Sequence, residues 1–186
     1  MRVLAISGSL RAGSHNTSLL RAVAELAPAG VEVELWGGLR DVPPYDQDAD
    51  GVDPVPAAVA SLRESVDGAD AVLFATPEYN HSIPGVLKNA LDWASRPHSA
   101  HSFTGKPVAV IGSSAGIFGA VWAQAELRKV LGAMGARVVD LELPIGEAQE
   151  KLDAEGNLVD EELREKLAEV LEALLAAAPA PELAAA

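Results

Sequence analysis

The fold of this chain is constrained most strongly by residues 3–20, VLAISGSLRAGSHNTSLL. The apolar run at 3–6 is typical of a buried strand in a parallel sheet. A loop of small and polar residues with one cation, Arg11, follows this run, and from about Asn16 the apolar residues recur with helical spacing. This order predicts free backbone N–H groups and the positive end of a helix dipole at the carboxyl edge of a sheet, where an anion can bind.

Two widespread phosphate-binding loops do not fit this stretch. Gly8 and Gly13 have the spacing of a Walker loop, but Ser14 stands where the lysine would be, which argues against an NTPase. Leu10 replaces the second glycine of the dinucleotide-binding pattern. The stretch therefore predicts a site for one phosphate monoester, with an ordinary βα turn and helix cap as the alternative. The candidate donors to such a phosphate are Ser7, Ser9, Arg11, Ser14, Asn16 and Thr17.

Composition narrows the class of protein further. A chain of 186 residues, 49% of them hydrophobic, is long enough for one α/β domain with a full core. We expect no membrane span and no signal peptide, because apolar runs are short and the chain begins with a strand. The absence of cysteine excludes disulfides and thiol catalysis and agrees with a cytoplasmic protein. The formal net charge of −13 argues against nucleic acid and anionic membranes as partners.

Alternation of strands and helices predicts an open, doubly wound parallel sheet of five strands with helices on both faces. An acidic stretch at 46–51 begins like a calcium loop, but Ala57 stands at its twelfth position, so we interpret it as a solvated loop. We expect one domain over 1–178 and a disordered tail over 179–186. The predicted strands are 3–6, 31–35, 70–76, 107–111 and 136–143. Of the predicted helices, the first starts near 16, the second and third span 55–67 and 84–93, the fourth ends near 131 and the fifth starts near 160.

Three of these strands, which end at Ile6, Thr76 and Ile111, run into loops of unusual chemistry. In the strand order 2-1-3-4-5 they are neighbours, so their three loops should meet beyond the carboxyl ends of the strands. This convergence predicts one composite ligand site rather than three separate loops.

The second and third loops favour a flat ligand. The second, at 77–80, is stiff and presents an aromatic ring, an amide and a carboxylate, while the third, at 112–116, has small side chains that let a backbone approach closely. A phosphate at one end and a planar polar ring at the other describe a mononucleotide, and FMN is the simplest candidate. The alternative for Tyr79 is packing at a subunit interface, and for Glu78 it is a helix cap or a structural hydrogen bond.

A hydrolase is the main competing interpretation. The sequence at 112–116 fits G-x-S-x-G, the nucleophile elbow of α/β-hydrolases. In that fold the histidine follows the nucleophile, whereas His15, His81, His98 and His101 all precede Ser114. A rearranged triad with His81 is the remaining form of this hypothesis. The histidines also lack metal-ligand spacing, so no metal site is predicted.

The segments GSLRAGSHN, TPEYNHSIPGVLKNALDW and SSAGIFG together resemble the NADPH-dependent FMN reductase family, a flavodoxin-like group that includes quinone, chromate and azo-dye reductases. The similarity runs from residue 2 to about 135. It implies a flavodoxin-like three-layer sandwich and a homodimer or homotetramer with the flavin near a subunit boundary. The chain departs from many members at Gly119-Ala120, where they have two glycines, and Trp122 follows. The resemblance implies that the phosphate is held by Ser9, Arg11, Ser14, His15, Asn16 and Thr17, and the ring by Pro77, Glu78, Tyr79 and Asn80 on one side and Ser113, Ser114, Ala115 and Gly116 on the other.

The function expected on this basis is an FMN-dependent NAD(P)H oxidoreductase. FMN carries the chemistry, so no catalytic side chain is required of the chain. Nicotinamide passes a hydride to the flavin and leaves, and a quinone, flavin, chromate or azo acceptor then uses the same face, in a ping-pong mechanism. NADPH and NADH both remain candidate co-substrates. The alternative is a flavodoxin-like one-electron carrier that does not itself oxidise NAD(P)H, with which the acidic charge agrees.

Overall fold

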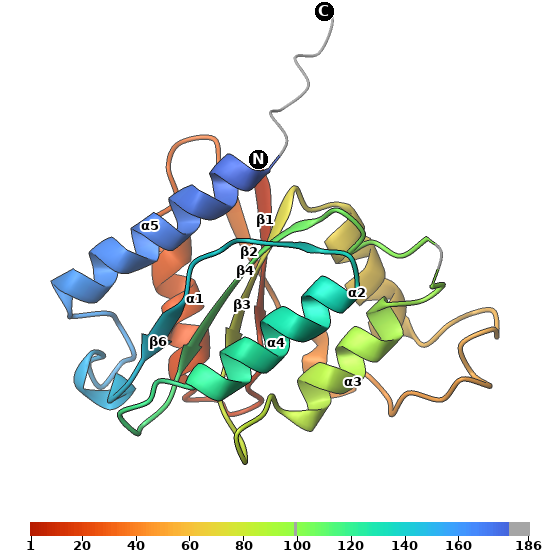
Figure 1. Ribbon diagram of the computed structural model, residues 1–186, viewed down its shortest axis with the longest axis horizontal. Coiled ribbons are helices and arrows are strands. Elements are labelled where there is room, and N and C mark those ends of the chain that lie inside the picture. The colour runs from red at the N-terminus through yellow and green to blue at the C-terminus, as the bar shows by residue number, and fades with distance from the viewer. Residues whose placement is uncertain (99, 179–186) are drawn as a thin grey trace, which may run out of the picture.

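The computed structural model describes residues 1–98 and 100–178, which form an α/β sandwich (Figure 1). The parallel sheet has the order β2-β1-β3-β4-β5, with β6 also paired to β4, so the predicted order is confirmed. The strands are β1 (Arg2–Ser7), β2 (Glu32–Trp36), β3 (Ala71–Thr76), β4 (Pro107–Ser113), β5 (Arg137–Val138) and β6 (Leu143–Ile145), and the helices are α1 (His15–Glu25), α2 (Ala57–Asp67), α3 (Gly85–Ala94), α4 (Val121–Ala133) and α5 (Glu161–Ala177), with short 3-10 turns η1 (Gly38–Asp41) and η2 (Ala148–Glu150).

Helices cover both faces of the sheet, as Figure 1 shows. Alternate residues of the central strands point to opposite faces, so Phe74 packs in the core beneath α2, α3 and α4, while Leu73 packs beneath α1 and α5. Every residue of β3 and of β4 is buried. Burial on both faces explains why these strands are nearly continuous apolar runs in the sequence.

The single fifth strand predicted at 136–143 is wrong: it is divided into β5 and β6, both paired with β4. The chain between them leaves the sheet, and Arg128 of α4 binds it there. The guanidinium donates to the carbonyls of Val139 and Leu141 at 2.8 and 3.0 Å and to the carboxylate of Asp140 at 3.1 Å. These carbonyls therefore find their partner in a side chain instead of a neighbouring strand.

The loop after β4 is longer than the sequence suggested, because α4 begins only at Val121. Gly119 has a φ of +58°, and a Cβ there would lie 2.3 Å from the backbone nitrogen of Ile145, so glycine is required. Ala120 follows with a φ of 59° and is buried. A glycine at position 120 would adopt this left-handed backbone without strain. This explains why a second glycine suits this position in proteins of the resembling family that have two glycines where this chain has Gly119-Ala120.

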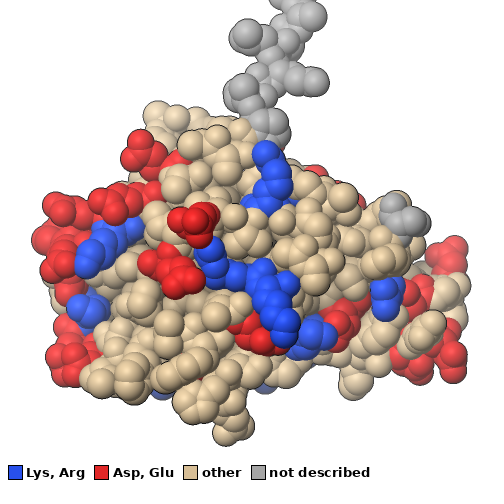
Figure 2. All heavy atoms as spheres, viewed as in Figure 1, with Lys and Arg blue, Asp and Glu red and all other residues tan. Residues whose placement is uncertain are grey.

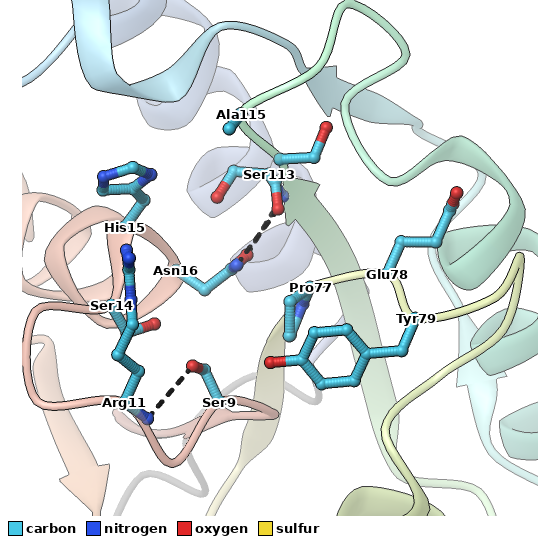
Figure 3. A pocket seen from close by; sticks show the side chains of 11 residues that line it. Ser9, Arg11, Ser14, His15, Asn16, Pro77, Glu78, Tyr79, Ser113 and Ala115 are labelled. Atoms are coloured by element: carbon cyan, nitrogen blue, oxygen red, sulfur yellow. Dashed lines mark hydrogen bonds between the residues drawn. The ribbon is translucent and has the colours of Figure 1, made fainter.

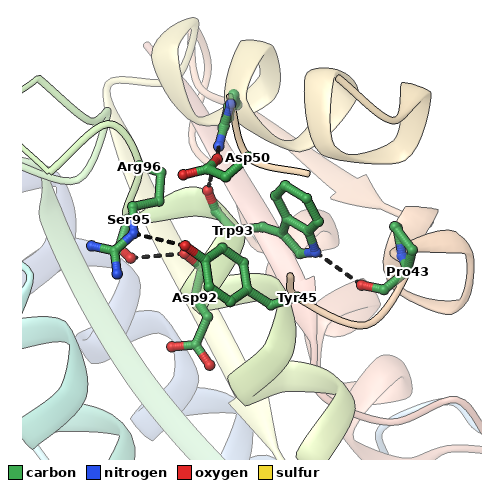
Figure 4. Close-up of polar contacts among 8 residues, drawn as sticks. Pro43, Tyr45, Asp50, Asp92, Trp93, Ser95 and Arg96 are labelled. Carbon is green, nitrogen blue, oxygen red and sulfur yellow. Dashed lines mark hydrogen bonds and ion pairs between the residues drawn. The ribbon is translucent and has the colours of Figure 1, made fainter. Parts of the chain in front are cut away.

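The acidic loop after η1 is tied to α2 and α3 (Figure 4). Trp93 donates from its indole nitrogen to the Pro43 carbonyl at 2.9 Å, and Arg96 donates to the Tyr45 hydroxyl at 3.1 Å. Asp50 forms an ion pair with Arg63 at 2.9 Å. The loop therefore lies at the surface, in keeping with the predicted solvated loop. It differs from that prediction in being hydrogen-bonded to neighbouring segments and in having one carboxylate, that of Asp50, in an ion pair.

The predicted tail at 179–186 lies outside the described residues. No helix in the described part of the chain combines the length and the apolarity needed to cross a bilayer.

Candidate functional site

The loops that follow β1, β3 and β4 meet at the carboxyl edge of the sheet and enclose a cavity of about 250 Å³ (Figure 3). The strand pairing places these three loops side by side, because β1 and β4 both pair with β3. The convergence predicted from the sequence is therefore present. The cavity is lined by Ser9, Arg11, Ser14, His15, Asn16, Pro77, Glu78, Tyr79, Ser113, Ser114 and Ala115, all of them predicted site residues.

The first loop closes one end of the cavity with the N-terminus of α1. Ser14 is the N-cap, and its hydroxyl accepts from the backbone N–H of Thr17 at 3.3 Å. The backbone N–H groups of His15 and Asn16 lie in the first turn, where the helix itself offers no acceptor. Exposed Arg11 stands beside them. Burial, followed by the charge of Arg11, holds the pKa of His15 below its usual value, so its imidazole is neutral at pH 7.

Asn16 joins the first loop to the third. Its amide donates to the Ser113 carbonyl at 3.2 Å, and its carbonyl accepts from the Ser113 N–H at 3.0 Å. The residue is only 3% exposed. Both polar ends of this side chain are thus engaged with β4, and what Asn16 presents to the cavity as a donor is its backbone N–H.

Three predicted site residues do not line the cavity. Thr17 turns away from it, because its hydroxyl donates to the Ser7 hydroxyl at 2.8 Å. Asn80 is exposed in a turn with a φ of 53°. Gly116 accepts hydrogen bonds through its carbonyl from the Ser114 hydroxyl and the Glu147 N–H.

Glu78 caps the N-terminus of α4, although it lies on the loop that follows β3. The residue at the N-cap position of α4, Ala120, has no side chain that can accept a hydrogen bond. The Glu78 carboxylate takes that part, accepting from the N–H groups of Trp122 and Ala123 at 3.0 and 3.1 Å. The helix-cap alternative for Glu78 is therefore observed, and a carboxylate there also interacts favourably with the helix dipole.

The second loop packs directly on the first. Gly8 donates to the Ala75 carbonyl at 2.8 Å, and a Cβ at Gly8 would meet Leu87 at 3.0 Å and Pro77 at 3.3 Å. Pro77 and Tyr79 form the wall opposite α1, and the exposed Tyr79 ring points across the cavity toward Ser9 and Arg11 in Figure 3. The close approach explains why the residue before Ser9 has no side chain.

Two serines of the third loop line the cavity, and their hydroxyls differ in hydrogen bonding. The Ser113 hydroxyl is buried and has no hydrogen-bond partner within the described residues. The Ser114 hydroxyl, the nucleophile of the hydrolase hypothesis, donates to the Gly116 carbonyl at 3.0 Å. His81, the proposed base of that hypothesis, packs against Trp122 instead. This geometry does not form the hydrogen bond from nucleophile to base that a triad needs.

Sequence reasoning noted Trp122 but did not connect it or Phe118 with other side chains. Phe118 and Trp122 are exposed, and their ring centroids lie 5.1 Å apart. The available signal was a tryptophan near the start of a predicted helix, but the side chains that lie beside it could not be identified without the fold. No group of three or more acidic or imidazole side chains among residues 1–98 and 100–178 is placed to hold a metal ion.

Comparison with known proteins connects this sequence to a family. The sequence matches the profile of NADPH-dependent FMN reductases over residues 1–150. An NAD(P)H-dependent FMN reductase of Pseudomonas aeruginosa is 45% identical over 175 residues, which cover 94% of this chain and 93% of the relative. A quinone reductase of Escherichia coli K12 is 39% identical over 163 residues, which cover 87% of this chain and 86% of the relative.

A solved structure agrees. FerB of Paracoccus denitrificans, described as a flavoenzyme NAD(P)H:(acceptor) oxidoreductase, matches with a TM-score of 0.82 at 37% identity, over 94% of this chain and 95% of FerB. The fold is thus shared with a solved flavoenzyme that is similar in sequence along nearly the whole chain. The chain belongs to the NADPH-dependent FMN reductase family, oxidoreductases that use FMN with NAD(P)H on a flavodoxin-like fold.

Proposed function

We propose that this protein is a quinone reductase that binds FMN, oxidises NAD(P)H and reduces a small-molecule acceptor in a ping-pong mechanism. The observation that carries the proposal is the cavity itself: Arg11 and the N-terminus of α1 lie at one end, and Pro77 and Tyr79 form a wall at the other. A ligand with a charged phosphate at one end and a planar ring at the other needs these two environments.

The residues present fit FMN. Its phosphate would be held by Arg11, by the hydroxyls of Ser9 and Ser14 and by the N–H groups that begin α1, His15 and Asn16. The ring would lie between the 77–79 wall and the 113–115 segment. A buried hydroxyl without a partner normally costs free energy, so the orphaned Ser113 hydroxyl in the cavity wall supports a ligand with a polar edge at this place.

When bound, FMN supplies the two-electron chemistry, accepting a hydride from NAD(P)H and returning it to the acceptor. The chain positions the ring and binds the phosphate. We assign no catalytic acid or base to it, since the carboxylate of Glu78 is occupied with the start of α4. Tyr79 lines the cavity and is 56% exposed, so the cavity is open to solvent at this residue. Nicotinamide and acceptor would use this opening in turn, which is the basis of the ping-pong proposal.

Quinones are the acceptors we favour, because relatives that match most of the chain are named quinone reductases. Free flavin, chromate and azo compounds are further candidate acceptors. The resemblance to the family further leads us to propose a cytoplasmic homodimer or homotetramer, which light scattering of the purified protein would test.

The deciding experiment separates the enzyme from the electron carrier. Purified protein is loaded with FMN and mixed with NADPH or NADH under argon, and then with 1,4-benzoquinone. We expect bleaching of the flavin absorbance, re-oxidation by the quinone and parallel initial-rate plots. A protein that binds FMN but is not bleached by either nucleotide would be a one-electron carrier, in keeping with its net charge of −13. A protein that does not bind FMN would refute both.

A further inference from the structure

The loop between β4 and α4, residues 114–120, carries no charged side chain. In Figure 2 acidic side chains gather at both ends of the molecule, whereas the lower edge, where the loops after β3 and β4 project, is largely uncharged on this face. Ion pairs through its own side chains therefore do not fix this loop, although Ser114 and Ala115 line the cavity. Its position depends on hydrogen bonds and packing.

One side of the β4–α4 loop is held by backbone groups of the segment at and after β6. Ser114 donates its N–H to the carbonyl of Ile145 at 3.1 Å. The N–H groups of Glu147 and Ala148 donate to the carbonyls of Gly116 and Ser114 at 3.1 and 3.2 Å. These contacts join main chain to main chain, so they do not depend on which side chains the loop carries.

The other side of the loop is held by one buried side chain, that of Gln124 in α4. Gln124 is only 2% exposed, and its Nε2 donates to the carbonyl of Gly119 at 3.0 Å. A Cβ at Gly112 would lie 2.9 Å from the Gln124 Cγ and 3.0 Å from its Nε2. The same amide therefore lies against β4 just before the loop and binds the loop near its end.

Gln124 and Asn16 approach the end of β4 from opposite faces of the sheet. Alternate strand residues face opposite sides, so Gly112 faces the layer of α4 and Ser113 the layer of α1. Asn16 binds both backbone groups of Ser113 from the α1 side, while Gln124 packs on Gly112 from the α4 side. The position of this cavity wall is thus set by a buried amide from each layer of helices.

The second polar atom of Gln124 indicates why the side chain is polar. Its Oε1 is buried and has no hydrogen-bond partner within residues 1–98 and 100–178. Such an acceptor costs free energy, and a methionine of similar length would fill the space without it. What methionine lacks is the donor to Gly119. Residues that are not optimal for stability are typical of positions that serve function.

We propose that Gln124 is a positioning residue for FMN: by donating to Gly119 it fixes the loop that carries Ser114 and Ala115 against the bound ring. Gln124 does not itself line the cavity, so it acts through the loop. This inference rests on the FMN site of the proposed function, but not on the identity of the acceptor. The competing role for Gln124 is to stabilise the start of α4 alone.

The first test compares FMN affinity with stability. Gln124→Met removes the donor and keeps the length of the side chain, and the control is Leu131→Ala, a fully buried core position of the same helix. In fluorescence titrations we expect the Kd for FMN to rise on the order of 5-fold in Gln124→Met, the effect of losing one hydrogen bond. Leu131→Ala should lower the Tm, because it leaves a cavity in the core, without changing the Kd.

Two measurements on FMN-free protein examine the loop itself. The Tm of Gln124→Met should stay close to that of the wild type, because loss of the bond to Gly119 is offset by removal of the unpaired acceptor. The amide hydrogen of Ser114 should exchange faster in Gln124→Met than in Leu131→Ala, relative to the unfolding rate of each. A lower Tm with an unchanged Kd would assign Gln124 to the fold and overturn the proposal.

The second test restores the donor with pH. The carboxyl introduced by Gln124→Glu can donate to the Gly119 carbonyl when protonated, but repels it when ionised. Burial raises the pKa of such a carboxyl above its usual value of about 4.3. We therefore expect the ratio of variant Kd to wild-type Kd to fall on the order of 5-fold between about pH 9 and about pH 5.5. Titratable groups common to both proteins, including Glu78 at the first turn of α4, cancel in this ratio.

The proposal is overturned if Gln124→Met binds FMN as the wild type does, if Leu131→Ala weakens FMN binding equally, or if the Kd ratio of Gln124→Glu does not change with pH. Failure of the proposed function looks different. Wild-type protein that does not bind FMN would refute that function, whereas FMN binding that depends on Gln124 in a protein not reduced by NAD(P)H would refute the enzyme and leave the role of Gln124 standing.

Discussion

Replacing Asn16 with alanine tests whether the tie between α1 and β4 holds the site together. The substitution removes hydrogen bonds of 3.2 and 3.0 Å and leaves the N–H and C=O of Ser113, which is buried, without partners. Each unsatisfied buried group costs about 1–3 kcal/mol, so we expect a destabilisation of roughly 3 kcal/mol. In a domain of this size about 1 kcal/mol shifts the Tm by roughly 2–4 °C, which predicts a Tm lower by roughly 6–12 °C.

Asn89 provides a matched control. Its side chain makes the same pair of contacts with a loop backbone, accepting from the Tyr45 N–H at 2.7 Å and donating to the Pro43 carbonyl at 2.8 Å, and it does not line the cavity. Thermal melts of FMN-free protein should show a loss in both Asn16→Ala and Asn89→Ala. Only Asn16→Ala should also weaken FMN binding, by on the order of tenfold or about 1.4 kcal/mol, because Asn16 positions two walls of the cavity.

The reasoning fails if Asn16→Ala melts within about 2 °C of the wild type, since that is less than 1 kcal/mol in a domain of this size. It also fails if FMN titrations give the same loss for Asn89→Ala, because the effect would then reflect stability alone and not the geometry of the cavity.

Three further predictions follow from single contacts. Arg11→Ala should weaken FMN binding by about 1.5–3 kcal/mol, the range for a charge-assisted hydrogen bond, whereas Arg21→Ala, an exposed cation of α1 that does not line the cavity, should leave the affinity measured by fluorescence titration unchanged. Glu78→Ala should remove the cap of α4 and lower the free energy of unfolding by about 1 kcal/mol. The measurement is amide hydrogen exchange, which should be faster at Trp122 and Ala123 in Glu78→Ala but not in the control variant Glu126→Gln. The Leu163 N–H and the Lys151 ammonium hold the pKa of Asp160 below its usual value, so its stabilising effect is present above its unfolded pKa of about 3.9 and is lost as pH falls through the lower folded value. Denaturation curves of Asp160→Asn should therefore differ from wild type at pH 7 and converge with it at strongly acidic pH.

Much of the candidate site could be predicted because its signals are local. The residue types of the three loops, and their position directly after buried strands, are visible in the sequence, and the carboxyl ends of parallel strands necessarily lie at one edge. Topology then brings the loops after Ser7, Thr76 and Ser113 together without further information. Topology does not select the individual residues: His15, for example, was assigned to the site only through the family resemblance, and the structure places it among the 11 residues around the cavity.

The sequence by itself determined the α/β class and the chemistry of the three loops, since both depend on hydrophobic period and neighbouring residues. The strand order 2-1-3-4-5 was an expectation for a doubly wound sheet, and the structure confirms it. Only the tertiary structure decided that the Asn16 amide binds Ser113, that Glu78 caps α4, that Thr17 turns to Ser7 and that the fifth strand is interrupted at Arg128. The partners of Asn16 and Glu78 lie 97 and 44 residues away in the chain. A polar side chain has several possible acceptors and donors, and which one it meets is set by how the packed layers place distant backbone groups, not by its neighbours in sequence.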